Sequence, residues 1–386
     1  MKKMKLAWSA MASLLVFSGG AHAQSSVSLY GVIDEGLNYT SNANDHSAWQ
    51  MKSGDTYGSR WGLKGTEDLG GGYKAIFKLE SGFDVNSGQS GQGSRLFGRQ
   101  AYVGLSSDQY GTVTFGRQYD TSVDDYGFGA LTAPGNYGGD VNAHPFDNDN
   151  TDWDFRVNNA VKYVSPTYRG LTAEAMYGFS NQPGGFSNNR VWGATLNYQN
   201  GGLTAAASYL KLNNAGATSA GAVATDVLFE GSSQQDIGVA ATYRFTNTLV
   251  GLAYSHVDVY DPTFNAYFTS QAGPAGGTWN AWKFDNFEVN DQYFFRPDLW
   301  LGAAYTFTIA HLHATTGSYT PKWHQVGLTL NYDLSKSTSI YAQGTYQHVM
   351  SAHTGTDFDF AQNPAAAGIS TSQNQMVYRV AMIHRF

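Results

Sequence analysis

The end of the chain alternates between apolar and polar side chains, as a half-exposed β-strand does. Within residues 375–386, one parity holds Tyr378, Val380, Met382, His384 and Phe386, and the other holds Arg379, Ala381 and Arg385. Successive side chains of a strand point to opposite faces. One mostly apolar face, one basic face and a terminal aromatic residue are typical of a barrel with lipid outside and water inside. The pattern therefore predicts a transmembrane β-barrel.

The start of the chain has the three parts of a secretory signal peptide. Residues 1–23 hold a basic start with three lysines, an apolar run over 6–17 and a small-residue cleavage site that ends at Ala23. We expect cleavage between Ala23 and Gln24. The rest of the chain, 24–386, is then one exported barrel in the outer membrane.

The composition agrees with a barrel and disagrees with a soluble protein. Charged residues make up only 14% of the chain, which is too few for an ordinary soluble surface. After the signal peptide, no apolar stretch reaches the roughly 18 residues that a membrane helix needs. A β-barrel resolves the conflict, because alternation halves the hydrophobicity of every strand.

Two further features of the composition exclude classes of function. The chain has no cysteine, which excludes disulfide scaffolds, thiolate zinc sites and cysteine nucleophiles. Its formal net charge of -7 becomes -10 once the three lysines of the signal peptide are removed. This acidity argues against a nucleic-acid partner, for which a basic face is expected.

The mature region consists of strand-like segments separated by alternating short turns and long loops. We expect about sixteen strands, at 27–39, 60–68, 73–84, 95–106, 111–120, 156–165, 170–180, 190–199, 202–212, 234–246, 248–260, 284–296, 299–312, 322–334, 338–350 and 375–386. The polar stretch 40–57 is expected to be a loop. Soluble sandwiches and propellers also have many strands, but such regular alternation of loop lengths favours an outer-membrane barrel with both termini on the short-turn side.

The longest early connection, Thr121 to Phe155, is rich in Gly, Asp and aromatic residues. Loops of this length are uncommon and tend to be functional or disordered. A barrel of about sixteen strands encloses an aqueous channel, so we expect this loop to fold into the lumen and narrow it.

Basic residues on inward positions of the early strands would face this loop. Parity sends Arg60, Lys64, Lys74 and Lys78 inward, and Arg95, Arg99, Arg117 and Arg156 are further candidates. Parity alone leaves Arg99 ambiguous, since Ala101, Val103 and Leu105 share its face. A ring of cations opposite loop carboxylates would select solutes by size and charge.

Several of these segments resemble the trimeric general porins of Gram-negative bacteria, most closely the Neisseria and Burkholderia type. The segments that carry the resemblance are Ser26 to Asp34, Ser59 to Gly70, Leu96 to Leu105, Gly111 to Gln118, Arg156 to Tyr163 and the terminal Phe386. The resemblance implies an all-β fold, a 16-stranded antiparallel transmembrane barrel with its third loop in the lumen. It also implies a homotrimer that passes small hydrophilic solutes passively, without a cofactor or enzymatic turnover.

The resemblance also implies roles for individual residues. Arg60, Arg99 and Arg156, with Lys64 beside them, match the family's basic constriction cluster, which places Arg99 in the lumen. Pro134 to Asp140 matches a loop segment in which related porins often have a Glu that this chain lacks, so the acidic side passes to Asp124, Asp125 or Asp140. A weakened acidic side predicts a preference for anions. The C-terminal strand, with Tyr378 and Phe386, is the expected signal for the barrel-assembly machinery, and lipid and lipopolysaccharide are the expected surroundings.

Other functions fit the sequence less well than a general porin does. An outer-membrane hydrolase needs a nucleophile beside a base, and the chain has no recognised motif for one. His311 and His313 share a strand face, and the acidic run 147–154 suggests calcium, but the run lacks the Gly and Glu of an EF-hand loop. We expect no metal site. A sugar-specific channel would use the loop aromatics as a stacking track. We expect them instead to anchor the loop to the wall: Tyr126, Phe128, Tyr137, Phe146, Trp153 and Phe155.

Overall fold

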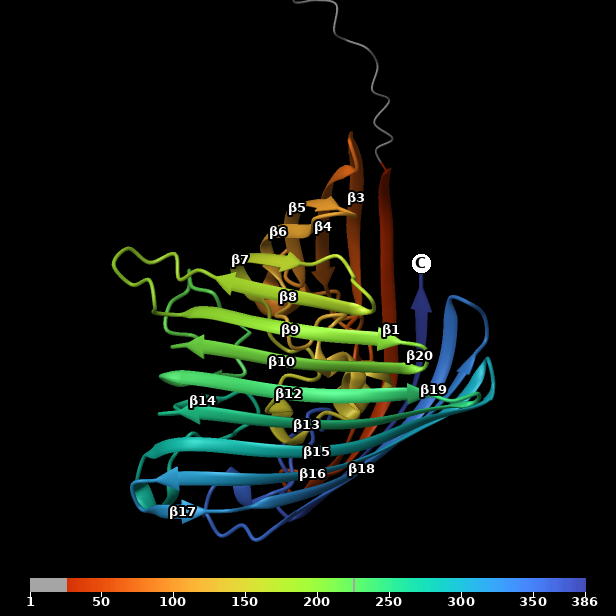
Figure 1. The fold of residues 1–386 in the computed structure, drawn as a ribbon. Helices are drawn as coiled ribbons and strands as arrows, with labels where there is room; N and C mark the ends of the chain where they lie inside the picture. The colour runs from red at the N-terminus through yellow and green to blue at the C-terminus, as the bar shows by residue number, and fades with distance from the viewer. Residues whose placement is uncertain (1–25, 225) are drawn as a thin grey trace, which may run out of the picture.

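Each strand of the main sheet pairs antiparallel with its neighbours, and the last strand pairs with the first. The computed structural model describes residues 26–224 and 226–386. In it, β1 (Ser26–Ala43) pairs on one edge with β20 (Asn374–Arg385) and on the other with β2 (His46–Ser53) and β3 (Arg60–Gly70). The sheet therefore closes into a barrel (Figure 1), which leaves no backbone edge exposed to lipid.

The ring has sixteen strands, as predicted. The sheet contains eighteen strand segments in the described part of the chain. However, β2 and β3 follow the same edge of β1 and so form one interrupted strand, and β17 (Gly317–Tyr319) only extends the β16 hairpin. The other members are β4 (Tyr73–Gly82), β5 (Gln100–Ser107), β6 (Gly111–Gln118), β7 (Val157–Val164), β8 (Leu171–Gly178), β9 (Arg190–Asn200), β10 (Leu203–Asn213), β12 (Ser233–Arg244), β13 (Thr248–Tyr260), β15 (Trp279–Arg296), β16 (Leu299–Ala314), β18 (Lys322–Asp333) and β19 (Thr338–Met350).

The remaining elements are short and lie in the connections. A two-stranded sheet pairs β11 (Phe229–Glu230) with β14 (Phe264–Asn265). Among the described residues, helical segments are α1 (Gly91–Ser94) and single turns at Phe128–Leu131, Pro134–Gly138, Gly139–Val141, Pro145–Asp147, Pro274–Gly276 and Asp357–Asp359. In this part of the chain no helix has the length and apolar character needed to cross a membrane.

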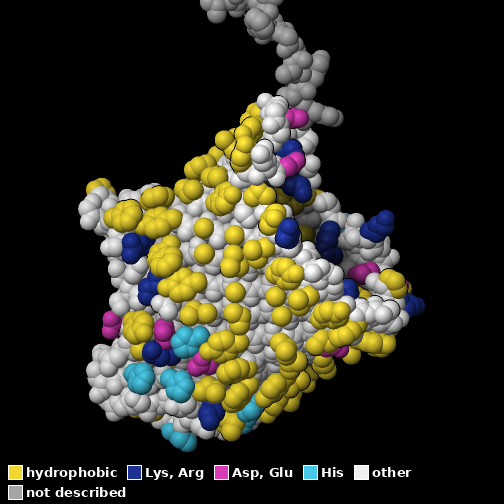
Figure 2. Space-filling model, in the orientation of Figure 1, with side chains coloured by type: hydrophobic (Ala, Val, Ile, Leu, Met, Phe, Trp, Pro, Cys, Tyr) yellow, Lys and Arg dark blue, Asp and Glu magenta, His cyan; other side chains and the backbone are white. Residues whose placement is uncertain are grey.

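The alternation predicted for the C-terminal strand is confirmed. Tyr378, Val380 and Met382 are 49%, 67% and 51% exposed, whereas Arg379 and Ala381 are 1% and 8% exposed. The same alternation in the other strands covers the outer wall with apolar side chains (Figure 2). Polar residues make up most of the opposite face, with an apolar cluster at the long-loop end. The barrel therefore has a largely polar interior and an outer surface suited to lipid.

The prediction of a loop at 40–57 is wrong. β1 continues to Ala43, and the chain turns through Asn44 and Asp45, with φ of 51° and 71°, into β2. Two consecutive residues with positive φ make the tight turn that suits a β-hairpin, and Asn and Asp tolerate it. The polar composition concealed a hairpin that extends the wall at the long-loop end. The break at 54–59 separates β2 from β3.

Residues 119–156, here called the inner loop, contact the inward-facing side chains of the strands. The Tyr137 hydroxyl donates to the Ala303 carbonyl oxygen at 2.9 Å, and Gln343 Nε2 donates to the Gly138 carbonyl oxygen at 2.9 Å. In Figure 1 this yellow segment lies inside the ring of strands. The inner loop thus occupies part of the space that the barrel encloses.

Aromatic residues pack tightly beside the inner loop at the long-loop end. Phe146 of the inner loop contacts Phe268, Trp323 and Phe358, with ring centroids 5.1, 5.7 and 5.6 Å apart. Trp282 of β15 lies 5.4 Å from Phe358. All except Phe268 are almost fully buried. This cluster joins three long connections to the strands and fills one side of the barrel with apolar side chains.

Candidate pore constriction

Glu80, on the inner face of β4, is surrounded by cations. Its carboxylate lies 2.9 Å from Arg99 Nε, 3.5 Å from Lys78 Nζ and 3.8 Å from Arg60 Nε. The Tyr30 hydroxyl donates to the same carboxylate at 2.8 Å. Three of the predicted basic residues therefore converge, and the group that brings them together is a buried carboxylate that the sequence patterns did not reveal.

Arg99 lies in the lumen, although Val103 and Leu105, which alternation would place on the same face as Arg99, point outward. It precedes the first residue of β5, so its side chain is not bound by the alternation of the strand. Its backbone N–H donates to the Glu80 carbonyl oxygen at 3.1 Å, and its guanidinium turns toward the Glu80 carboxylate. The ambiguity of the parity pattern thus reflects an irregular segment just before the strand.

Tyr119 connects Arg99 to Arg156. Arg156 Nη2 donates to the Tyr119 hydroxyl at 2.8 Å, and the ring centroid lies 4.8 Å from the Arg156 guanidinium and 5.8 Å from that of Arg99. Trp153 packs edge-on against the same ring at 5.1 Å. Burial opposes the phenolate, but the two guanidinium groups outweigh it and lower the pKa of Tyr119. This stack continues the basic wall into the inner loop.

The remaining predicted cations are not all near this group. Lys64 faces Lys78 across the β3–β4 pair, with its Nζ 5.3 Å from the Tyr30 ring centroid. Lys74 lies near a short turn, where it pairs with Asp108 at 3.7 Å. Arg117 pairs with Asp226 of the connection after β10 at 2.5 Å. Lys64 is therefore close to the cations around Glu80, whereas Lys74 and Arg117 pair elsewhere.

Two of the three predicted loop carboxylates are bound by lysines that sequence reasoning missed. Asp124 forms an ion pair with Lys162 of β7. Asp140 pairs with Lys52 of β2 at 3.3 Å, and its backbone N–H donates to the Asp55 carbonyl oxygen at 2.8 Å. Both lysines lie on wall strands far from the loop residues in sequence, so no local pattern could have indicated them.

Two cavities meet beside this wall. A cavity of 420 Å³ is lined by Arg60, Glu80 and Asp125 among others, and a second of 290 Å³ reaches Asp140. Arg99 and Trp153 line both cavities. The space between the inner loop and the early strands therefore narrows where the inner loop approaches Arg99.

Arg379 forms a second buried charge cluster, in the barrel wall. Its Nη2 lies 2.8 Å from Asp34 and its Nη1 3.4 Å from Asp55, and its Nε donates to the Tyr341 hydroxyl at 2.7 Å. Parity had placed Arg379 on the inner face. Its partners became visible only in the closed barrel, where β20 lies beside β1.

The loop aromatics lie mostly as expected for anchors. Phe128, Phe146 and Phe155 are each 1% exposed and Tyr137 is 3% exposed, all packed against the wall or against other loops. Tyr126 is 37% exposed. Most of these rings are therefore unavailable as a stacking track for a sugar.

Some of the candidate metal-binding side chains contact other protein groups. Within residues 26–224 and 226–386, no group of three or more His, Cys, Asp or Glu side chains is arranged to hold a metal ion. In the acidic run, Asp149 pairs with His144 at 2.8 Å, and Asp147 accepts the Asp152 backbone N–H at 3.1 Å. His313 bonds Ser318 at 3.0 Å on the outer face of the barrel.

A closed antiparallel barrel with an apolar outside, a polar inside and a charged narrowing defines a membrane channel of the outer-membrane type. Comparison with known proteins gives the family. The chain belongs to the Gram-negative porins, whose family model matches residues 7–350. It is a diffusion porin of the outer membrane, a passive water-filled channel.

The individual relatives of this chain are also outer-membrane porins. The chain is 34% identical over 385 residues to an outer membrane porin protein of Bordetella pertussis, covering 89% of this chain and 94% of that protein. It is 28% identical over 401 residues to outer membrane porin protein 32 of Delftia acidovorans, covering 100% of both. Among solved structures, the anion-selective porin from Comamonas acidovorans has the same fold, with a TM-score of 0.71 at 21% identity, covering 94% of this chain and 100% of that one.

Proposed function

We propose that solutes are selected where the inner loop faces the cations around Glu80, and that the constriction prefers small anions. Arg60, Lys78 and Arg99 share the single Glu80 carboxylate, so this wall keeps a positive charge. Across the gap, Asp124 is bound by Lys162, and Asp140 shares Lys52 with Asp55. Asp125 is the predicted loop carboxylate that lines the same cavity as Arg60. This asymmetry is the observation that carries the proposal.

The mechanism is electrostatic and needs no chemical step. In a narrow aqueous gap with walls of low dielectric constant, fixed charges raise the local concentration of ions of opposite sign. Arg156 adds a further cation at the edge of the gap, held by Tyr119. The name of the Comamonas relative, an anion-selective porin, supports the same sign for this chain. Passage is passive diffusion, without turnover or a cofactor.

The sign of selectivity can be measured directly. Single channels of the full chain, recorded in a planar bilayer between 1.0 M and 0.1 M KCl as about a tenfold gradient, give a reversal potential whose sign identifies the more permeant ion. We expect chloride to be the more permeant ion. A reversal potential of the opposite sign would refute the anion preference, while leaving the diffusion channel itself intact.

We propose that the chain assembles as a homotrimer. β5, β6, β7 and β8 have 8 residues each, fewer than the roughly 9–11 that a strand needs to cross a bilayer. A neighbouring subunit would cover the side of the barrel that has these short strands, where the wall is too low to match the thickness of the bilayer. Unboiled protein on a native gel or in native mass spectrometry should show three copies, and a monomer in mild detergent would refute the assembly.

We propose that residues 1–23 are removed during export and that the C-terminal strand directs insertion. Residues 1–23 lie outside the described part of the chain. The intact mass of protein extracted from outer membranes should correspond to a chain that starts at Gln24. Deletion of Phe386 should reduce the amount of inserted barrel, because this exposed residue directly follows β20, the strand that the barrel-assembly machinery would engage.

A further inference from the structure

Another cavity lies between the inner loop and the short-turn end of the barrel. It has a volume of 310 Å³ and is lined from the inner loop, from the break at 54–59 and from the inward faces of β15, β16, β18, β19 and β20. Of its described lining residues, only Thr56 also lines the cavities that meet at Arg99. Ser335 and Lys336, in the turn after β18, are exposed, so the cavity reaches solvent at this end.

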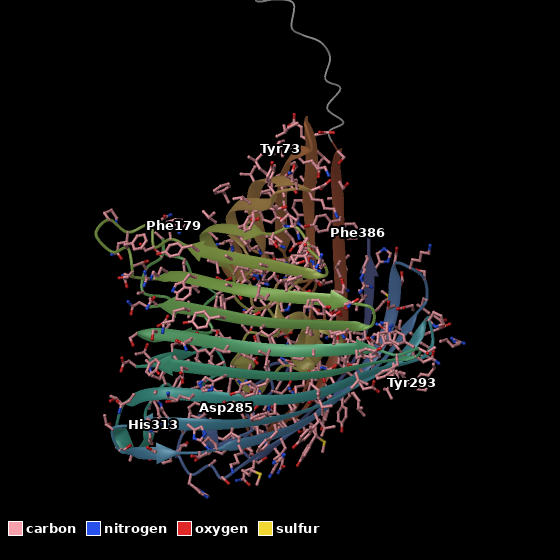
Figure 3. The ribbon with its side chains drawn as sticks, viewed as in Figure 1. Tyr73, Phe179, Asp285, Tyr293, His313 and Phe386 are labelled. Carbon is pink, nitrogen blue, oxygen red and sulfur yellow. The ribbon has the colours of Figure 1, made fainter. Side chains whose placement is uncertain are left out.

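Two cations in the lining have no carboxylate partner. Lys336 lies in the turn between β18 and β19, and Arg385 is the last residue of β20. In the described ranges 26–224 and 226–386, neither makes an ion pair or a side-chain hydrogen bond. The Arg385 guanidinium lies 4.9 Å from the ring centroid of Tyr57. Figure 3 labels the neighbouring Phe386 at this end of the barrel.

Asp333 of β18 is the carboxylate of the described lining, and it is already engaged by its neighbours. Its Oδ1 accepts from Asn331 Nδ2 at 2.8 Å and from the Ser339 hydroxyl at 2.6 Å. Two positive charges against one negative charge leave the lining with a net charge of +1. Fixed charge of this sign favours an anion in the cavity.

Trp300 brings an indole ring into the same lining. It lies on the inward parity of β16, and its ring meets that of Tyr137 edge-on, with the centroids 5.8 Å apart. Tyr57 packs against the buried Tyr341. The interfacial aromatic residues of outer-membrane barrels face outward, so Trp300 is not one of them. The cavity therefore combines rings held in place by protein contacts with cations that have no partner.

We propose that this cavity binds small aromatic carboxylates, with the carboxylate on Arg385 and the ring against Trp300. A guanidinium group binds a carboxylate through paired N–H donors. Aromatic rings attract one another in offset or edge-on packing, and a cavity of roughly 300 Å³ is large enough for a small ligand. The inference goes beyond the proposed selectivity at Glu80, which depends on charge alone, because this site also requires a ring.

A bound carboxylate should be detectable in the ion current. The cavity lies in the lumen, so an occupant narrows the path for salt while it is bound. Single channels of the full chain in KCl, with benzoate added, therefore test the site. Acetate supplies the carboxylate without a ring, and benzyl alcohol supplies the ring without a charge.

The variants separate this site from the rest of the lumen. Arg385→Gln removes the partner of the carboxylate, and Trp300→Leu removes the partner of the ring. Arg296→Gln is the matched control, because it removes an exposed cation at the same end that pairs with Asp298 and does not line the cavity. Heat-modifiable migration would show that the variants are folded.

Benzoate should reduce the open-channel current of the wild type as its concentration rises, and acetate and benzyl alcohol should not. The half-blocking concentration should rise about tenfold in Arg385→Gln and about fivefold in Trp300→Leu, and should stay unchanged in Arg296→Gln. Equal block by acetate or benzyl alcohol would overturn the proposal. So would an unblocked wild type, or block that is unchanged in either lining variant. The reversal potential in KCl alone tests the constriction separately, because no benzoate is present.

Discussion

The ring of Phe128 lies against the backbone of Gly238, in the space where any other residue would place its Cβ atom. Two further inner-loop residues are seated in the same way: Tyr137 lies over Gly302 and Asn142 over Gly327. These glycines belong to β12, β16 and β18, on the side of the barrel away from Glu80. Each of these glycines forms a socket, which here means a place on the wall where an inner-loop side chain occupies the space of the missing Cβ atom. The inner loop is therefore held by contacts that only glycine permits.

Replacing Gly238 with Val should push the inner loop off the wall toward the cations around Glu80. We expect a lower single-channel conductance and more current noise, because Phe128 can no longer occupy its socket. Ala241→Val adds similar bulk to the outer face of the same strand and should leave the conductance unchanged. Wild-type conductance in Gly238→Val would show that this socket does not set the width of the pore.

His144 holds the inner loop through two buried carboxylates, Asp149 at 2.8 Å and Glu288 of β15 at 3.0 Å. His144→Leu would leave both without their shared partner, and breaking a buried pair costs about 3–5 kcal/mol. We expect a lower urea midpoint for loss of the heat-modifiable form in micelles. An unchanged midpoint would mean that the carboxylates are satisfied without the imidazole.

The same contact predicts a dependence on alkaline pH. Burial disfavours the charged imidazole, but Asp149 and Glu288 outweigh it and raise the pKa of His144 to about 10. Because the pKa is higher in the folded state, the charged imidazole stabilises the fold fully below its ordinary pKa of about 6.5. This stabilisation is lost as the pH rises through about 10. Current noise should therefore increase between about pH 7 and about pH 10.5, following the titration of this group. In His144→Leu that increase should be absent.

Arg60→Ser should weaken the positive wall. We expect the reversal potential in a salt gradient to move toward cation permeability, and the conductance to rise slightly because a bulky side chain is removed. Lys74→Ser is the matched control, since Lys74 pairs with Asp108 at a short turn. Equal shifts in both variants would show that overall charge, rather than the cations around Glu80, determines selectivity.

Arg379→Met should destabilise the closed barrel, because it leaves Asp34 buried without its cation and leaves Asp55 with Lys52, at 2.8 Å, in place of two cations. The expected loss is about 3–5 kcal/mol of unfolding free energy. Arg296→Gln, which breaks an exposed pair with Asp298, should change stability by less than about 0.5 kcal/mol. Restoration of stability by adding Asp34→Asn to Arg379→Met would identify the uncompensated charge of Asp34 as the cause.

Several features of the fold could be predicted because they depend only on neighbours in the chain. The parity of Tyr378 and Arg379 indicated the two faces of the last strand, and the spacing of turns indicated sixteen strands. The hairpin at Asn44 and Asp45 was missed, because a polar edge of the wall has the composition of a loop. Arg99 was ambiguous for a related reason: alternation ends where the regular strand ends.

The sequence by itself determined that this chain is a barrel with a lipid-facing exterior, since alternation of side chains is a local property of the strand. Only the tertiary structure decided which charges meet. Glu80 gathers Arg60 and Arg99, and Lys162 neutralises Asp124, because closure of the ring and the path of the inner loop bring distant segments together. The balance of charge in the pore follows from those long-range distances, which no local pattern contains.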